Sequence, residues 1–170
     1  MRRRALLRGL GGGAVGIGGG CLGLGGDVVV EVHRDLTIDP GDAWVKQIPD
    51  VSDPGGAISY TVRSDDGPFD VYFFVGRGQY EHYDAFVGGG DPATTPVGNE
   101  RLSTAAVPQS GDGEMYQAAT HDDGAREPLN VEGPYYFAVD YTSYRMENPV
   151  DEYADPLGAF VDLTVVKKRF

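Results

Sequence analysis

We predict an all-β fold, an antiparallel β-sandwich of about eight or nine strands, for most of this chain. Apolar and polar residues alternate over several short segments, as they do in strands with one buried face. Gly, Pro and Asp gather between these segments, where they favour turns, for example in Asp39-Pro-Gly41 and Asp65-Asp-Gly-Pro68. No stretch shows sustained helical periodicity, so parallel strands joined by helices are not expected.

The predicted strands follow from this alternation in chain order. The strongest candidates place apolar side chains on one face and are residues 28–38, 58–62, 69–75, 135–141 and 161–165. Weaker candidates are residues 44–48, 79–87, 101–107 and 114–120. Two stretches without periodicity, residues 88–100 and 143–158, are expected to be loops.

The charge balance is strongly acidic, with 26 Asp and Glu against 14 Lys and Arg and a formal net charge of −12. Arg2, Arg3, Arg4 and Arg8 precede the predicted domain, which leaves 26 acidic against 10 basic residues, or −16, in the remainder. An acidic surface rich in Asp and poor in Lys is typical of adaptation to high salt, which screens repulsion between carboxylates. No basic patch is available to neutralise phosphates, so we expect no nucleic-acid partner.

Residues 1–26 have the features of an export signal followed by a lipid-attachment motif and a short Gly-rich tether. The signal matches the twin-arginine pattern through Arg3, Arg4, Leu6 and Leu7. Cys21, the only cysteine, follows three glycines like the lipid-accepting cysteine of a lipobox, although Gly18 stands where Leu or Val is usual. We therefore expect export and attachment to the extracellular face of the cell membrane through lipid on Cys21. An uncleaved amino-terminal helix is the alternative, and the many glycines disfavour it.

Residues 27–170 are expected to form a single β-sandwich domain. Its strand motifs run Gly56-Ala-Ile-Ser-Tyr-Thr-Val-Arg63, Phe69-Asp-Val-Tyr-Phe-Phe-Val75, Gly133-Pro-Tyr-Tyr-Phe-Ala-Val-Asp140 and Phe160-Val-Asp-Leu-Thr-Val165. In this order the domain resembles the GOLD (emp24-like) β-sandwich, and the whole chain is similar to small lipoproteins that haloarchaea export by the twin-arginine route. The chain lacks the paired cysteines and carboxy-terminal membrane helix of the eukaryotic members, so their role in vesicle cargo does not carry over. The resemblance implies a non-catalytic recognition domain.

The predicted domain lacks the residues that most classes of catalytic mechanism need. The one thiol lies before the predicted domain, which argues against cysteine catalysis and against a blue-copper centre. No Gly-x-Ser-x-Gly elbow is present, and the Gly76-Arg-Gly78 segment leads into a predicted strand rather than a phosphate-binding helix. We expect no cofactor and no enzymatic activity.

Two kinds of candidate binding residues remain. Tyr136, Tyr144 and Tyr153 are expected to be exposed aromatics that stack on sugars or anchor a protein partner, although packing at the rim of the core would also explain them. His82 and Asp84 lie two residues apart, on one side of a predicted strand, and are candidate metal ligands. Asp122-Asp123 and the acidic residues within 151–155 offer oxygen ligands for Ca²⁺, but clustered Asp is common in so acidic a chain.

These observations leave three functional hypotheses. The first is a cell-surface binding or accessory protein that recognises a protein or another envelope partner without catalysis. The second is a carbohydrate-binding module that uses exposed Tyr, and the third is a metal-dependent enzyme that uses His82 and Asp84.

Overall fold

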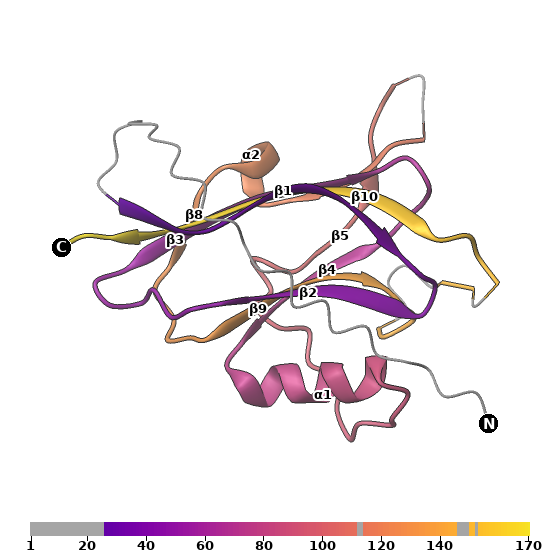
Figure 1. Cartoon of the computed structure of the whole chain (residues 1–170), viewed down its shortest axis with the longest axis horizontal. Coiled ribbons are helices and arrows are strands. Elements are labelled where there is room, and N and C mark those ends of the chain that lie inside the picture. The colour runs from indigo at the N-terminus through magenta and orange to yellow at the C-terminus, as the bar shows by residue number, and fades with distance from the viewer. Residues whose placement is uncertain (1–25, 112–113, 146–149, 152) are drawn as a thin grey trace.

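Two antiparallel β-sheets lie face to face in the computed structural model of the chain (Figure 1). The structure describes residues 26–111, 114–145, 150–151 and 153–170. The predicted all-β sandwich is confirmed, with ten strands among the described residues where about eight or nine were expected.

The larger sheet, sheet A, has the strand order β1-β10-β3-β7-β6, and β8 also pairs with β3. Its strands are β1 (Gly26–Ile38), β3 (Gly56–Ser64), β6 (Val107–Pro108), β7 (Tyr116–Ala119), β8 (Glu127–Leu129) and β10 (Leu157–Lys168). β1 and β10 pair along almost their whole lengths, from Gly26 opposite Lys168 to Ile38 opposite Leu157. The first and last strands of the described chain therefore lie side by side.

The smaller sheet, sheet B, has the strand order β2-β9-β4-β5. Its strands are β2 (Asp42–Ile48), β4 (Asp70–Val75), β5 (Thr104–Ala105) and β9 (Tyr135–Tyr141). All seven residues of β9 are buried. Alternate residues of a strand point to opposite faces, so sheet B must be covered on both sides at β9.

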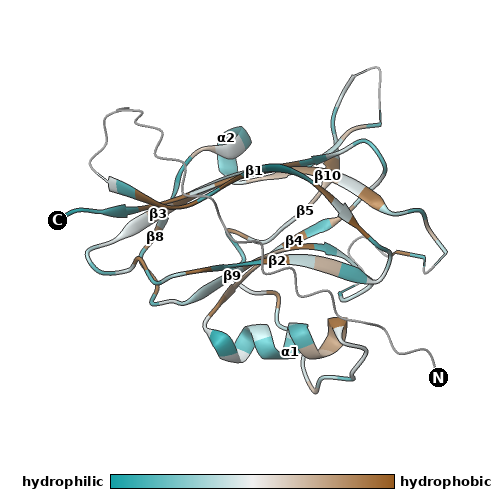
Figure 2. Cartoon of the chain, viewed as in Figure 1, coloured by the Kyte–Doolittle hydropathy of each residue, from teal (hydrophilic) through white to brown (hydrophobic). Residues whose placement is uncertain are grey.

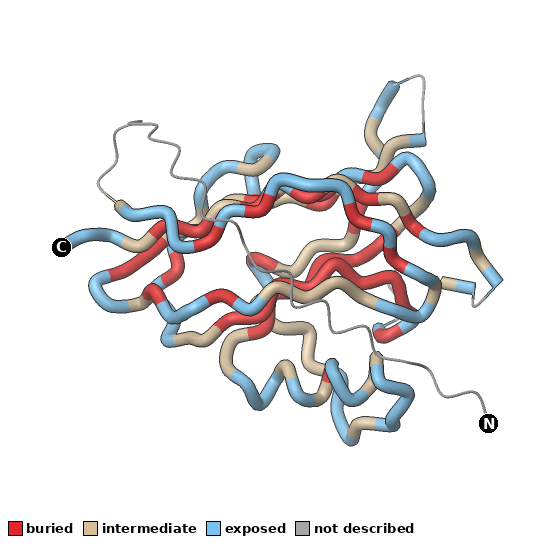
Figure 3. The backbone as a smooth tube through the Cα atoms, viewed as in Figure 1, coloured by how far each residue is buried: buried red, intermediate tan, exposed pale blue. Residues whose placement is uncertain are grey.

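The main hydrophobic core fills the space between the two sheets, where Figure 3 shows buried segments of both sheets facing each other. Val32, Val62 and Leu163 come from sheet A, and Phe73 and Phe137 from sheet B. The alternating pattern of the sequence predicted these inward faces because residues i and i+2 of a strand share a side.

Helix α1 (Arg77–Val87) lies on the outer face of sheet B (Figure 1), so the strand predicted over residues 79–87 is wrong. Gly76 begins the helix with φ 79° and ψ 159°, a backbone conformation that is almost restricted to glycine. Tyr80, Tyr83 and Val87 recur at helical spacing and pack against the sheet. Figure 2 shows the helix as hydrophilic over most of its length, with apolar residues at its end, which explains why its period was missed.

Several peripheral elements are shorter than predicted. The strand expected over residues 101–107 is reduced to β5 and β6, and the one expected over 114–120 is reduced to β7. The short helix α2 (His121–Gly124) follows β7, and its residues Asp122 and Asp123 have left-handed φ values of 53° and 55°. None of the described helices has the length and apolar character needed to cross a membrane.

Candidate functional site

An aromatic layer fills the space between helix α1 and sheet B. Its members are Tyr72, Phe74, Tyr80, Tyr83, Phe86, Tyr136 and Tyr144. Tyr80 stacks on Tyr136 with their ring centroids 4.0 Å apart and the planes parallel within 1°. Tyr144 packs edge-on against Tyr83, with centroids 4.9 Å apart. Such aromatic pairs add stabilisation beyond their buried area.

This layer corrects the expectation that Tyr136 and Tyr144 are exposed for stacking on sugars. Tyr136 is 8% exposed and Tyr144 is 4% exposed. The hydroxyl group of Tyr144 donates a hydrogen bond of 3.0 Å to the carbonyl oxygen of Pro96, which fastens the loop before β5 to the layer. Parity alone placed Tyr136 outward, and the unpredicted helix α1 covers that face.

A buried carboxyl group lies at the border of the aromatic layer. Asp140, the sixth residue of β9, is 1% exposed. The hydroxyl group of Tyr83 donates to its Oδ1 at 2.6 Å, and the hydroxyl group of Thr142 lies 2.9 Å from the same oxygen. Sequence reasoning missed this residue, because a polar residue in an alternating strand is expected to face solvent.

The pKa of Asp140 is raised to about 6. Burial is the main cause, the hydrogen bonds from Tyr83 and Thr142 oppose it, and the like charge of Asp70 adds a smaller increase. Asp70 is the register partner of Asp140 on β4. Burial also raises the pKa of the Tyr83 hydroxyl well above its usual value, with the charge of Asp140 as the next cause. A carboxyl group with a shifted pKa is a candidate catalytic group when it lines a cleft. Asp140 is 1% exposed and lies beneath Tyr83, so it does not line a cleft in this structure.

The candidate metal ligands are not brought together. His82 and Asp84 lie on helix α1, where residues two positions apart point to different sides, so the premise that they share one side is wrong. Among the described residues, no three His, Cys, Asp or Glu side chains lie close enough to hold a metal ion.

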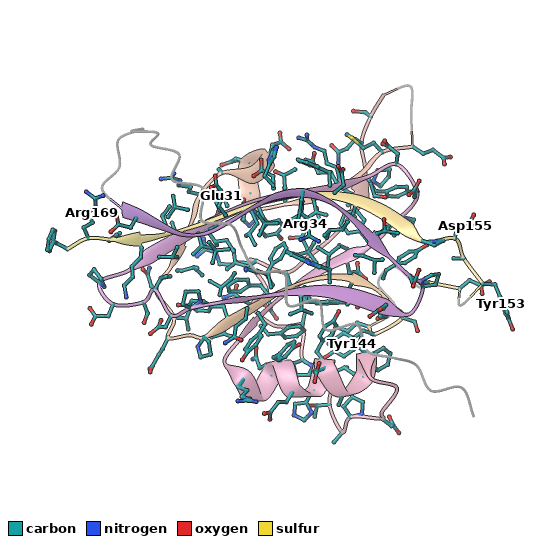
Figure 4. The ribbon with its side chains drawn as sticks, viewed as in Figure 1. Glu31, Arg34, Tyr144, Tyr153, Asp155 and Arg169 are labelled. Atoms are coloured by element: carbon teal, nitrogen blue, oxygen red, sulfur yellow. The ribbon has the colours of Figure 1, made fainter. Side chains whose placement is uncertain are left out.

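Tyr153 is the one predicted aromatic that is exposed, at 87% of its surface. Figure 4 shows it at the end of the sandwich opposite Arg169, with its side chain directed away from both sheets. Its backbone N–H donates a hydrogen bond of 3.0 Å to the side chain of Asp151. The predicted signal residues Arg3, Arg4, Leu6 and Leu7 and the predicted lipid-accepting Cys21 lie outside the described residues.

One side of the sandwich is open along strands β1 and β2. Each is the first strand of its sheet, and no described strand pairs with its outer side. The two strands follow one another in the chain and contact each other. Two cations lie on their core-facing sides, Arg34 between Val32 and Leu36 and Lys46 between Trp44 and Ile48. We call Arg34, Trp44, Lys46 and the outer sides of β1 and β2 the open edge.

The cations of the open edge are unusual in so acidic a chain. Neither Arg34 nor Lys46 forms an ion pair with a described residue. In Figure 4 Arg34 lies on the open side, between the two sheets. Inward-pointing charges on edge strands oppose pairing of the strand with a second copy of the same chain. The same charges leave the edge accessible to a partner that supplies carboxylates.

No protein-family description matches the chain, and no curated protein is similar to it in sequence.

Proposed function

We propose that this protein is exported and lipid-anchored through Cys21, and that its domain recognises a protein or envelope partner without catalysis. The export signal and lipobox pattern of residues 1–26 support the location. The order of strand motifs that resembles the GOLD sandwich supports a recognition role. The acidic, Lys-poor composition supports function in high salt.

The observation that carries the binding role is the open edge. Its two strands end their sheets, its backbone groups face away from the paired strands, and Arg34 and Lys46 stand there without ion-pair partners among the described residues. A partner segment with carboxylates can hydrogen-bond to the free strand edge and pair with these cations, as in recognition by strand addition. Trp44, half-buried against Phe137, offers an aromatic anchor beside them.

A carbohydrate-binding role is the second candidate, and Tyr153 is the observation that favours it. Tyr136 and Tyr144 are buried, so Tyr153 is the one predicted aromatic residue that can stack on a sugar. Loss of glycan-array binding in Tyr153→Ala, with binding retained in Arg34→Glu/Lys46→Glu, would favour this second role over the first.

The test of the first role is affinity capture from native envelope extract in molar salt. The bait is the mature protein, compared with Arg34→Glu/Lys46→Glu and with the matched charge reversal Arg77→Glu/Arg126→Glu, whose sites are exposed. At molar salt the screening length is about 3 Å, so only charges in direct contact matter. We expect a stoichiometric partner whose recovery falls at least about tenfold with the edge variant, because reversing two contact charges costs more than about 1.4 kcal/mol.

The control should capture the same partner as the wild type. Equal loss with both double variants would contradict recognition through the open edge. Turnover of a substrate by the purified domain, abolished by a point substitution, would contradict the non-catalytic role.

A further inference from the structure

The first and last described residues of the chain lie at the same end of the sandwich. Gly26, at the start of β1, pairs with Lys168, near the end of β10. The backbone N–H of Lys168 also donates a hydrogen bond of 2.8 Å to the carbonyl oxygen of Gly55 in the loop after β2. Through the pairing of β8 with the start of β3, the segment that follows Leu129 arrives at the same end. We call residues 26–29, 53–55, 131 and 167–170 the tether end.

The tether end must lie near the membrane if Cys21 carries lipid, and in this respect the inference rests on the proposed function. Cys21 precedes Gly26 by five residues. A fully extended chain of that length spans at most about 17 Å. The tether end is therefore held within this distance of the lipid headgroups, whereas Tyr153 projects from the opposite end (Figure 4).

Exposed apolar side chains concentrate at the tether end. Among the described residues, six large hydrophobic side chains are exposed, and four of the six belong to this end: Val28 at 57%, Val29 at 37%, Val131 at 47% and Phe170 at 105%. Exposed apolar side chains at one end of an otherwise strongly acidic protein indicate a surface that is covered in its working state.

Cations accompany these apolar residues. Lys167 and Lys168, two of the three lysines in the chain, line a shallow depression of about 540 Å³ together with Arg169, Val29, Pro54, Phe170, Asp27 and Asp53. The guanidinium group of Arg169 donates to Oδ1 of Asp27 from Nε at 2.9 Å and from Nη2 at 2.8 Å, so its charge is paired. Neither lysine forms an ion pair with a described residue.

We propose that the tether end docks on an anionic membrane surface, with Phe170, Val28, Val29 and Val131 entering the headgroup region and Lys167 and Lys168 facing lipid phosphates. The basic end of β10 then acts as a second membrane-binding element beside the lipid. Asp27 and Asp53 line the same depression, so they offset part of the positive charge of the lysines. In molar salt the charge contribution is screened and the apolar contribution persists.

The test uses the protein as its exporting host processes it, reconstituted on vesicles of equimolar brominated phosphatidylglycerol and phosphatidylcholine. Phe170→Trp places a fluorescent probe at the tether end, and Tyr153→Trp places the matched probe at the opposite end, while native Trp44 is common to both. We expect the added Phe170→Trp emission to shift to the blue and to be largely quenched, and the Tyr153→Trp emission to be unaffected. Equal quenching of the two probes, or of neither, would overturn docking.

A variant without the two lysine charges separates the electrostatic contribution to docking from the apolar contribution. Lys167→Gln/Lys168→Gln in the Phe170→Trp chain should lower the docked-to-undocked ratio by roughly 30-fold at low salt, because each cation near an anionic surface contributes a factor of about five. At molar salt the same variant should behave like its parent. An unchanged ratio at low salt would overturn the role of the lysines. The mass of the same sample reports whether Cys21 is acylated, so failure of the anchor is distinguished from failure of docking.

Discussion

At the scale of single residues, the buried carboxyl group of Asp140 links the packing of helix α1 to pH. Its folded-state pKa is about 6, whereas the ordinary value is 3.8. A raised carboxyl pKa means that the folded state binds the proton more tightly than the unfolded state. The corresponding stabilisation is therefore complete below pH 3.8, declines as the pH rises towards about 6, and is absent above that value.

Asp140→Asn should remove this pH dependence, because the amide keeps an oxygen acceptor for the Tyr83 hydroxyl and cannot ionise. Chemical denaturation of wild type between about pH 4 and pH 7 should show the free energy of unfolding falling by roughly 2 kcal/mol from this group alone. The variant should lose that slope and should be at least as stable as the wild type at neutral pH. A wild-type profile that rises over this interval and is unchanged by the substitution would contradict the burial of Asp140.

Asp50, at the surface, affects stability in the opposite direction, because its pKa is lowered rather than raised. Hydrogen bonds from backbone N–H groups of Ser52 and Gly133 lower its pKa to about 2. Its contribution is present above pH 3.8 and is lost as the pH falls through about 2. The two aspartates therefore act in separate pH intervals, so measurements above about pH 4 report Asp140 without interference from Asp50.

At the scale of elements, helix α1 depends on the backbone conformation of Gly76. A side chain at φ 79° and ψ 159° is strained whatever space surrounds it, and Gly76 has open space around its Cα. Gly76→Ala should lower the free energy of unfolding by about 1–3 kcal/mol. Thermal or denaturant unfolding of the purified protein measures the change.

Gly78→Ala is the matched control on the same element. Gly78 lies inside α1, and a Cβ atom there meets nothing within 4 Å. Alanine in an exposed helix is favoured over glycine, so this variant should gain about 0.5–1 kcal/mol. The same sign of change in both variants would show that residues 76–78 do not make the turn from β4 into a helix.

Five of the strands could be predicted from the sequence, whereas helix α1 could not. Strands β1, β3, β4, β9 and β10 were predicted because each has one face in the main core, which produces a period of two. Helix α1 was missed because its apolar face is narrow. Only Tyr83 of that helix is fully buried, and the spacing of Tyr80, Tyr83 and Val87 was the one available signal. A strand over residues 79–87 would leave the outer face of sheet B uncovered, so the sequence does not predict the burial of Tyr136, Tyr144 and Asp140.

At the scale of the whole molecule, the two ends of the sandwich have different character. The tether end carries the exposed apolar residues, Lys167 and Lys168, whereas Tyr153 and Asp155 lie at the other end (Figure 4). The open edge runs between these ends along β1 and β2. A domain held at the tether end would present both the open edge and Tyr153 to partners outside the cell, and this arrangement depends on lipid at Cys21.

Mass spectrometry of the protein extracted from its own membranes tests most directly whether Cys21 carries lipid. We expect a mature chain that begins at Cys21 and is heavier than the polypeptide 21–170 by the mass of its lipid. Replacement of the thiol in Cys21→Ser should abolish the added mass and release the domain from the membrane fraction. A chain that retains Met1, or that begins beyond residue 21 without lipid, would contradict the anchored arrangement.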